Sequence, residues 1–265
     1  NGGMHAGNSL PFQEFMISPN LGSFTENYFA AAEIYAQLRK NLKKQFGGAS
    51  TLLGDEGGFA PDGIEDTYQV LDILMKAISD TGYTGKVDIG LDIAASEFFI
   101  DGVYNLGFKT AEGDKKDVTA MLDLYVDLCE KYPIISIEDP FDQDDFSAFA
   151  QLRTRLAEKN VQVVGDDLTV TNPKRIQMAI EQKSANALLL KINQIGSITE
   201  AINAFKMAKS DNWNVMVSHR SGETTDDFIA DFAVGVGAEH VKFGSVARGE
   251  RVVKYNRLIA ISEEL

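Results

Sequence analysis

Cysteine is almost absent from this sequence. Cys129 is the one cysteine in 265 residues, and it lies among apolar residues at helical spacing. A disulfide needs two cysteines, and a Cys-based metal site needs several. The sequence therefore excludes a disulfide framework and a thiolate metal centre. It suits a reducing compartment, and we expect a cytoplasmic protein.

Long apolar runs and a surplus of basic residues are also lacking. No run approaches the ~20 apolar residues that a helix needs to cross a bilayer, and the amino end has no basic and then apolar leader. The 25 Lys and Arg are outnumbered by 39 Asp and Glu, which gives a formal net charge of -14. This charge repels nucleic acid and anionic membranes. We expect neither as a partner, whereas surplus carboxylates suit divalent cations.

Short apolar runs that alternate with helical patterns dominate the chain from Lys86 onward. The runs cover residues 87–92, 134–138, 161–166, 187–191, 215–219 and 241–242. This alternation predicts an α/β fold with a parallel sheet, either a (β/α) barrel or a doubly wound sheet. No G-x-G-x-x-G motif follows any run, which disfavours a dinucleotide-binding sheet.

An ionisable residue ends each of these six runs. In chain order they are Asp92, Glu138, Asp166, Lys191, His219 and Lys242. In a barrel the carboxyl ends of the strands meet at one mouth, where active sites are built. Three acids on consecutive strands can hold one Mg²⁺ and leave positions for water or substrate. For any single acid, capping of the next helix is an equal alternative, with Asp139 and Asp167 as further candidates.

Lys191 follows four apolar residues, as expected at the end of a strand that is buried on both faces. Burial disfavours the charged ammonium, so either carboxylates surround Lys191 or its pKa falls far enough for it to act as a base. A structural ion pair is the third alternative. To act as a base near neutral pH, the ammonium would have to titrate about three units below its usual pKa of ~10.4.

The first 80 residues break the strand and helix rhythm. We expect residues 10–17 to form a strand that Gln13 and Glu14 interrupt. The S-F-T-E sequence at 23–26 is a capping box, which predicts a helix that ends at Gly47. The amino-terminal part therefore needs a different arrangement from the later units.

Two loops carry further candidate residues. The glycine-rich stretch at 54–61 holds Asp55 and Glu56, and from the residues alone a solvated turn is the better interpretation. The sequence H-R-S-G at 219–222 is either a turn with an exposed basic pair or an anion site made of Arg, Ser and backbone N–H groups.

Eight stretches make the chain resemble the enolase family over essentially its whole length. They are N-G-G-M-H-A-G, Q-E-F-M-I, G-D-E-G-G-F-A-P, I-G-L-D-I-A-A-S-E-F-F, I-S-I-E-D-P-F, G-D-D-L-T-V-T-N-P-K-R-I, A-L-L-L-K-I-N-Q-I-G and V-S-H-R-S-G-E-T. The resemblance implies a barrel that starts ββαα before six βα units. It also implies reversible dehydration of 2-phosphoglycerate to phosphoenolpyruvate in glycolysis, with two Mg²⁺ per site and a homodimer.

The resemblance further implies roles for single residues. Asp92, Glu138 and Asp166 match the ligands of the first metal, and the latter two also border the substrate. Lys191 matches the base that removes the C2 proton, and Glu56 matches the acid that helps the C3 hydroxyl leave.

The remaining correspondences concern substrate binding. They are Gln13 and Glu14 beside the acid, His5 and His219 at the substrate, Arg220 and Ser221 at the phosphate, and Lys242 near the substrate carboxylate. Of these, Glu14 and His219 also count as catalytic. The resemblance thus implies a small phosphorylated acid as the substrate.

Asn1 begins the chain inside a loop, without a methionine. The resemblance implies that an amino-terminal α+β domain and the first barrel strand lie outside residues 1–265. We therefore expect one barrel domain, catalytically silent and prone to aggregate when expressed by itself. Two alternatives remain: another lyase or racemase of the superfamily, which a phosphate-type loop at 219–221 disfavours, and an enolase-like binding protein.

Overall fold

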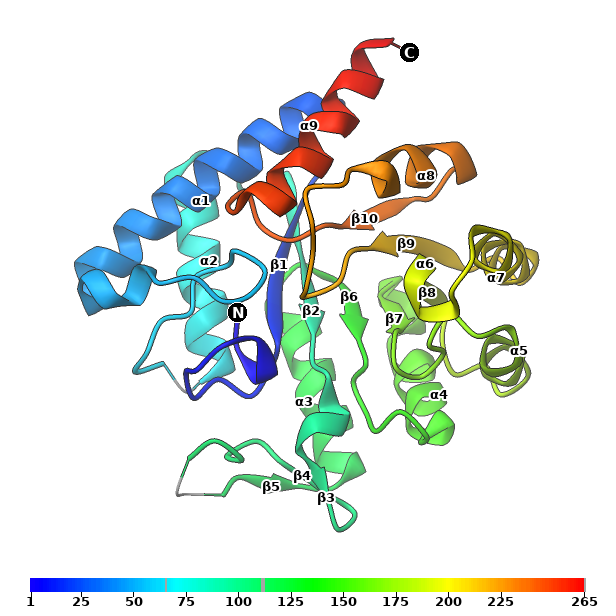
Figure 1. The fold of residues 1–265 in the computed structure, drawn as a ribbon. Coiled ribbons are helices and arrows are strands. Elements are labelled where there is room, and N and C mark those ends of the chain that lie inside the picture. Colours follow the sequence, from blue (N-terminus) through cyan, green and yellow to red (C-terminus); the bar gives the residue numbers. More distant parts are fainter. Residues whose placement is uncertain (65, 111–112, 265) are drawn as a thin grey trace.

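The main sheet of the protein follows the chain order of its strands. The computed structural model describes residues 1–64, 66–110 and 113–264. Its seven strands are hydrogen-bonded in the order β1 (Glu14–Pro19), β2 (Val87–Asp92), β6 (Ile134–Glu138), β7 (Gln162–Gly165), β8 (Ala187–Leu190), β9 (Asn214–Ser218) and β10 (His240–Lys242). A doubly wound sheet would reverse this order at a switch point. The sheet instead curls (Figure 1), so the barrel alternative is confirmed.

Helices cover the outer side of the curled sheet. They are α1 (Phe24–Phe46), α2 (Thr67–Asp80), α3 (Val118–Lys131), α4 (Phe146–Arg155), α5 (Pro173–Glu181), α7 (Ile198–Ser210), α8 (Phe228–Val236) and α9 (Gly249–Glu264). The short helix α6 (Ile192–Ile195) directly follows Lys191 at the carboxyl end of the sheet. Short 3-10 segments are η1 (Gly3–His5), η2 (Gly48–Thr51), η3 (Ala95–Phe98) and η4 (Ala157–Lys159). The capping box at residue 23 is confirmed, because Ser23 Oγ accepts the Glu26 N–H at 3.2 Å.

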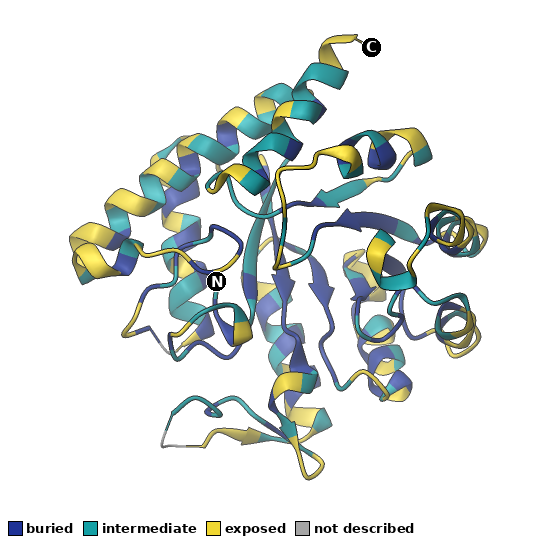
Figure 2. Cartoon of the chain, in the orientation of Figure 1, coloured by how far each residue is buried: buried dark blue, intermediate teal, exposed yellow. Residues whose placement is uncertain are grey.

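The core lies between the sheet and these helices. Figure 2 shows mostly buried strands and helices that are exposed on their outer faces. Phe141 is fully buried and packs edge to face against Tyr125 and Phe149, with ring centroids 5.7 and 5.8 Å apart. Removing a ring at such a position costs about 3–5 kcal/mol. This packing fixes β6 and its following loop, which carry part of the mouth.

Strand β1 starts later than the sequence predicts. It begins at Glu14 and runs antiparallel to β2, with Glu14 opposite Asp92. Gln13 still donates its N–H to the Asp92 oxygen at 3.0 Å, but the backbone oxygens of Gln13 and Leu10 accept bonds from Gly2 and Gly3, so the paired register begins at Glu14. The prediction of a strand from residue 10 was therefore wrong. The two helices between β1 and β2 agree with the ββαα start that the resemblance implies.

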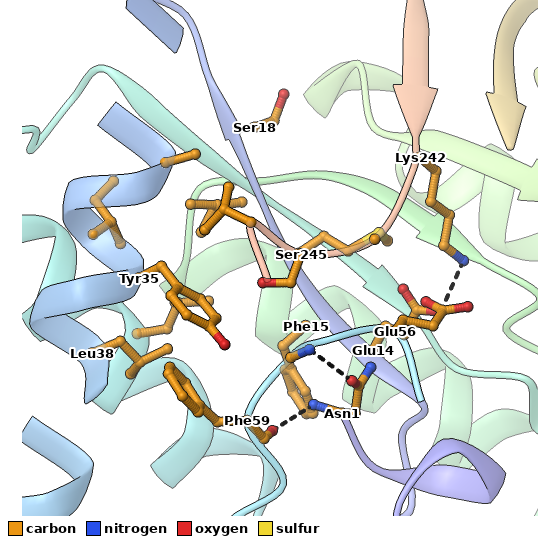
Figure 3. Close-up of a pocket in the computed structure, with 18 of the residues that line it drawn as sticks. Asn1, Glu14, Phe15, Ser18, Tyr35, Leu38, Glu56, Phe59, Lys242 and Ser245 are labelled. Atoms are coloured by element: carbon orange, nitrogen blue, oxygen red, sulfur yellow. Dashed lines mark hydrogen bonds and ion pairs between the residues drawn. The ribbon is translucent and has the colours of Figure 1, made fainter. Parts of the chain in front are cut away.

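Strands β1 and β10 are the edges of the curled sheet. Within the described part of the chain, β1 pairs only with β2, and β10 pairs only with β9. A cavity of about 400 Å³ lies beside both strands, and its lining includes Phe15, Tyr35 and Phe243. Figure 3 shows Lys242, Glu14 and Glu56 grouped at one side of this cavity. The cavity thus meets the mouth of the sheet.

The insertion after β2 forms a small sheet of its own. Its strands are β3 (Phe99–Ile100), β4 (Val103–Asn105) and β5 (Lys115–Lys116), which the sequence did not predict. Residues 111 and 112 of this insertion lie outside the described residues. Lys109 Nζ donates to the carbonyls of Ala6 and Asn8 at 2.9 and 3.0 Å, which ties the insertion to the loop after His5. No described helix is both long and apolar enough to span a membrane.

Candidate active site

The six predicted ionisable residues all reach the carboxyl end of the sheet. Asp92, Glu138 and Lys242 are the last residues of β2, β6 and β10, whereas Asp166, Lys191 and His219 directly follow β7, β8 and β9. These positions differ from the predicted strand ends by at most one residue. Five of the six are buried, and Lys191 is half-buried. Charge at this density in a buried place needs close pairing.

Lys242 holds two of the acids together. Its Nζ donates to Asp92 Oδ2 and Glu138 Oε1, each at 2.8 Å, and lies 3.4 Å from Glu14 Oε1. Burial works to lower the pKa of Lys242, but the charges of the acids outweigh it and raise this pKa well above its usual value. Burial and the neighbouring Asp92 raise the pKa of Glu138 well above its usual range. Lys242 therefore does not fully compensate the negative charge of the acids around it.

Lys191 is paired with the third acid. Its Nζ donates to Asp166 Oδ2 at 2.5 Å. Burial works to lower the pKa of Lys191, but the Asp166 carboxylate outweighs it, so this pKa is raised. Of the sequence-based alternatives, surrounding carboxylates are therefore correct. A lowered pKa for Lys191 is wrong for this arrangement, since Asp166 keeps the proton on the amine.

Asp139 supports the loop that carries the third acid. Its carboxylate oxygens accept the N–H groups of Asp166 and Asp167 at 3.0 and 2.7 Å, and side-chain atoms of these three acids converge within 4.8 Å. Helices α4 and α5 are capped by Asp145 and Asn172 instead. Helix capping by Asp139 or Asp167 was therefore the wrong alternative. In the sequence, this support corresponds to the adjacent acids of the E-D-P stretch, which contains Asp139, and of the G-D-D stretch, which contains Asp166 and Asp167.

Glu56 lies in a second group, on the β1 side of the mouth. His219 Nε2 is 3.2 Å from Glu56 Oε1, and His5 Nδ1 is 3.7 Å from the same oxygen. His5 Nδ1 is also 3.4 Å from Glu14 Oε1. The Glu56 side chain is only 5% exposed, so the interpretation of this loop as a solvated turn was wrong for Glu56, although Asp55 is exposed.

A glycine turn brings Glu56 into the mouth. Gly57 has φ of 84°, and a Cβ there would lie 2.6 Å from the Ala247 oxygen. Tyr35 in α1 donates its hydroxyl to the Gly57 oxygen at 2.8 Å. The turn therefore needs glycine for its left-handed backbone and for its close approach to the loop before α9.

The two histidines of this group differ in charge. Burial works to lower the pKa of His5, but Glu14 and Glu56 outweigh it, so the pKa is raised. Burial lowers the pKa of His219 to about 3, which leaves its ring neutral at physiological pH. His219 therefore acts as a neutral hydrogen-bonding group, whereas His5 is the histidine that can carry charge.

The remaining predicted residues lie on the rim. Gln13 Nε2 donates to Asp92 Oδ2 at 3.2 Å, so it contacts the acid group rather than Glu56. Arg220 is half-buried, and its Nη1 donates to Asn193 Oδ1 at 3.0 Å, while Ser221 is exposed. Both follow β9 at the mouth, which leaves the anion site and the exposed turn open as alternatives.

The acid group fits a hard divalent cation. Glu138 Oε2 and Asp166 Oδ1 are buried without a hydrogen-bond partner. Carboxylate oxygens are the ligands that Mg²⁺ prefers. Two groups among the described residues bring one ligand atom from each member within 4.8 Å of the others: Asp139, Asp166 and Asp167, and His5, Glu14 and Glu56. The predicted trio of Asp92, Glu138 and Asp166 is not one of them, so a shared ion there remains a prediction. In the present arrangement, two lysine ammonium groups balance part of the same charge.

A comparison with protein families places the whole chain. The family model described as Enolase, C-terminal TIM barrel domain, matches residues 1–265. A match over the whole chain supports a lyase or racemase of the enolase superfamily, a group that generally uses Mg²⁺. The curled sheet is consistent with a TIM barrel domain of this family. The chain belongs to the family of enolase C-terminal TIM barrel domains.

Proposed function

We propose that this chain carries the active site for the reversible, Mg²⁺-dependent dehydration of 2-phosphoglycerate to phosphoenolpyruvate. The observation that supports this most is the division of the mouth into two groups. One group contains Lys191 and the acids of β6 and β7, and the other contains Glu56 and its histidines. Elimination of water needs a base at one carbon and an acid at the leaving hydroxyl of the next carbon, whereas a racemase uses its second group to return a proton to the same carbon.

Lys191 is the proposed base. In its neutral form, Nζ takes the proton from C2 of the substrate, and the resulting ammonium is stabilised by Asp166 at 2.5 Å. Bound Mg²⁺ supplies the positive charge that makes a proton next to a carboxylate acidic enough to leave. Asp166 has to give up part of its hold on the Lys191 proton before each turnover.

Glu56 is the proposed acid. Its Oε2 is buried without a partner, so it is the atom that carries the proton for the C3 hydroxyl. The C3–O bond breaks, water leaves, and the C2=C3 double bond forms from the electrons of the broken C2–H bond. The other oxygen of Glu56 lies 3.2 Å from His219 Nε2 and 3.7 Å from His5 Nδ1, which leaves Oε2 as the oxygen directed away from the histidines.

Three other groups are proposed for substrate binding. Lys242 keeps its charge at working pH because its pKa is raised, and this suits a carboxylate. Arg220 and Ser221 on the loop after β9 suit a phosphate, since Arg can contact two of its oxygens at once. Homodimerisation, a cytoplasmic location and a role in glycolysis remain predictions.

Formation of phosphoenolpyruvate tests the proposed function. The natural protein that carries this chain is assayed by absorbance with 2-phosphoglycerate, with and without Mg²⁺. A panel of unphosphorylated 2-hydroxy acids and amino acids is tested in parallel. We expect product only from 2-phosphoglycerate and only with Mg²⁺. Turnover of a panel acid with none of 2-phosphoglycerate would favour another lyase or a racemase, and no turnover of any acid would favour a binding protein.

A further inference from the structure

Helix α9 inserts two cations under the mouth. Arg251 and Lys254 are each only 1% exposed, although both side chains carry charge. Residues three apart lie on the same face of a helix. A buried charge is strongly unfavourable unless it is paired and hydrogen-bonded. Each of these two cations must therefore be paired with acceptors inside the protein.

Arg251 holds the start of the loop after β9. Its Nη1 donates to the Arg220 oxygen at 2.6 Å and contacts His219 Nδ1 at 2.7 Å. Its Nη2 donates to the oxygens of Ser221 and Asp55 at 2.6 and 3.2 Å. One guanidinium thus joins the loop of residues 219–221 to the loop that carries Glu56.

The same guanidinium sets the tautomer of His219. An arginine N–H group can only donate, so His219 Nδ1 must accept, and the ring proton lies on Nε2. That nitrogen is 3.2 Å from Glu56 Oε1. The N–H of His219 Nε2 therefore lies beside the carboxylate of the proposed acid, although the two atoms do not meet hydrogen-bond geometry in this arrangement. With the proton on Nδ1 instead, the lone pair of His219 Nε2 would face a lone pair of the Glu56 carboxylate.

Lys254 holds the far end of the same loop. Its Nζ donates to the Thr224 oxygen at 2.9 Å and lies 3.1 Å from Glu223 Oε2. The other oxygen of Glu223 accepts the backbone N–H of Arg220 at 3.2 Å. The loop 219–224 is therefore fixed at both ends by side chains of one helix.

Space for Arg251 is provided by a glycine. A Cβ at Gly244 would lie 2.7 Å from Arg251 Cδ, and Gly244 has φ of 88°. Since both cations are buried under the loop, neither faces the space above the strand ends where a substrate would bind. Their effect on the reaction has to pass through the groups that they hold.

We propose that Arg251 is a positioning residue, which fixes the His219 tautomer and, with Lys254, the loop that binds the anionic group of the substrate. The proposal rests on the proposed function for its kinetic consequences, whereas the tautomer can be observed without any substrate. A guanidinium is required at position 251 because its four acceptors exceed the three donors of an ammonium.

The first test is the nitrogen NMR spectrum of the histidines in the natural protein, without substrate. We expect an unprotonated Nδ1 and a protonated Nε2 for His219. A protonated Nδ1 would overturn the proposal, and this measurement needs no variant. It also stands if 2-phosphoglycerate is not the substrate, which separates the two proposals.

The second test compares three variants of α9. For Arg251→Lys we expect mixed His219 tautomers and a loss of roughly 100-fold in kcat, as a 1 Å misplacement can cause. For Lys254→Met we expect a higher KM with a smaller change in kcat, because Lys254 does not contact His219. Arg257→Lys is the control, since Arg257 pairs with Asp231 on α8, away from the loop.

A merely structural role would lower the unfolding midpoint in all variants without altering the tautomer. Folded Arg251→Lys with the parent tautomer and the parent kcat would therefore contradict the proposal. If Arg251→Lys does not fold, the spectrum of the unsubstituted protein still decides the tautomer. A KM that rises by more than kcat falls in Lys254→Met then supports a role of the loop in substrate binding, and an unchanged KM contradicts it.

Discussion

The two groups at the mouth are built in different ways. Lys191 and the acids of β2, β6 and β7 stand on strand ends, so the sheet itself sets their spacing. Glu56 stands on a loop that Arg251 of α9 and Tyr35 of α1 hold by bonds to the Asp55 and Gly57 oxygens, and His5 ends the distant segment η1. We call the group with Lys191 the base side and the group with Glu56 the acid side. The base side depends on the fold of the sheet, whereas the acid side depends on a few long-range hydrogen bonds.

The largest expected effect comes from removing either reacting group. Lys191→Ala and Glu56→Gln should each lower turnover of 2-phosphoglycerate by roughly 10⁴-fold, near the upper limit for general acid or base catalysis. Lys174→Ala on α5 is the control, because its side chain is exposed. Formation of phosphoenolpyruvate is the measurement. Parent-level turnover in either variant would remove that residue from the reaction.

The next effect concerns metal affinity at the predicted ligands Asp92, Glu138 and Asp166. Asp92→Asn, Glu138→Gln and Asp166→Asn should each weaken Mg²⁺ binding by roughly 100-fold, since loss of a supporting residue alone costs 10–100-fold. Titration calorimetry on the natural protein measures this. Asp88→Asn, earlier on β2, is the matched control. Unchanged binding in all three variants would contradict the assignment of the ligands.

A smaller effect distinguishes the two histidines by pH. In nitrogen NMR spectra, His219 should stay neutral down to about pH 4, because its pKa is about 3. His5 should titrate above its usual pKa, because Glu14 and Glu56 outweigh its burial. A His219 ring that protonates near pH 6.5 would show that it is not buried as described.

The lowered pKa of His219 and the raised pKa of His5 change the free energy of unfolding in opposite directions as pH changes. The His219 contribution is present above pH 6.5 and is lost as pH falls towards 3, because only the unfolded chain binds the proton there. The His5 contribution is present below pH 6.5 and is lost as pH rises through its raised pKa. His219→Gln should therefore flatten the acid limb of stability, by up to about 1.4 kcal/mol per pH unit. Urea unfolding at several pH values measures this.

The smallest expected effect tests the support of the acid side. Tyr35→Phe removes the hydroxyl bond to the Gly57 oxygen and should lower the free energy of unfolding by about 1 kcal/mol. Tyr83→Phe is the control, since its hydroxyl bonds Glu33 at an exposed site. Urea unfolding gives both values. A smaller loss for Tyr35→Phe than for Tyr83→Phe would mean that α1 does not hold the turn.

The sequence predicted the base side well because its signals are local. Apolar runs of four or five residues identify strands, and an ionisable residue at the end of a buried parallel strand has to face the mouth. The bounds of β2 and β6 are those predicted, and Asp92 and Glu138 end them. Even here, the pKa of Lys191 could not be predicted, because its direction depends on the distance to Asp166.

The sequence did not predict the acid side, because the contacts that build it join residues far apart in the chain. Nothing in G-D-E-G-G shows that Glu56 is buried while its neighbour Asp55 is exposed, since that depends on the loop before α9. Arg251 likewise resembles a surface residue of a polar helix, and its contact with His219 spans 32 residues. Only the resemblance to the enolases pointed to Glu56, and no sequence signal pointed to Arg251.

Exchange of the C2 proton tests the central claim most directly, because it separates the two groups. The natural protein and its Lys191→Ala and Glu56→Gln variants are incubated with 2-phosphoglycerate and Mg²⁺ in deuterium oxide, and deuterium at C2 is followed by NMR. We predict that Glu56→Gln still exchanges this proton although it forms no phosphoenolpyruvate, and that Lys191→Ala does neither. Exchange at the parent rate in Lys191→Ala would contradict the assignment of the base and, with it, the division of the mouth into a base side and an acid side.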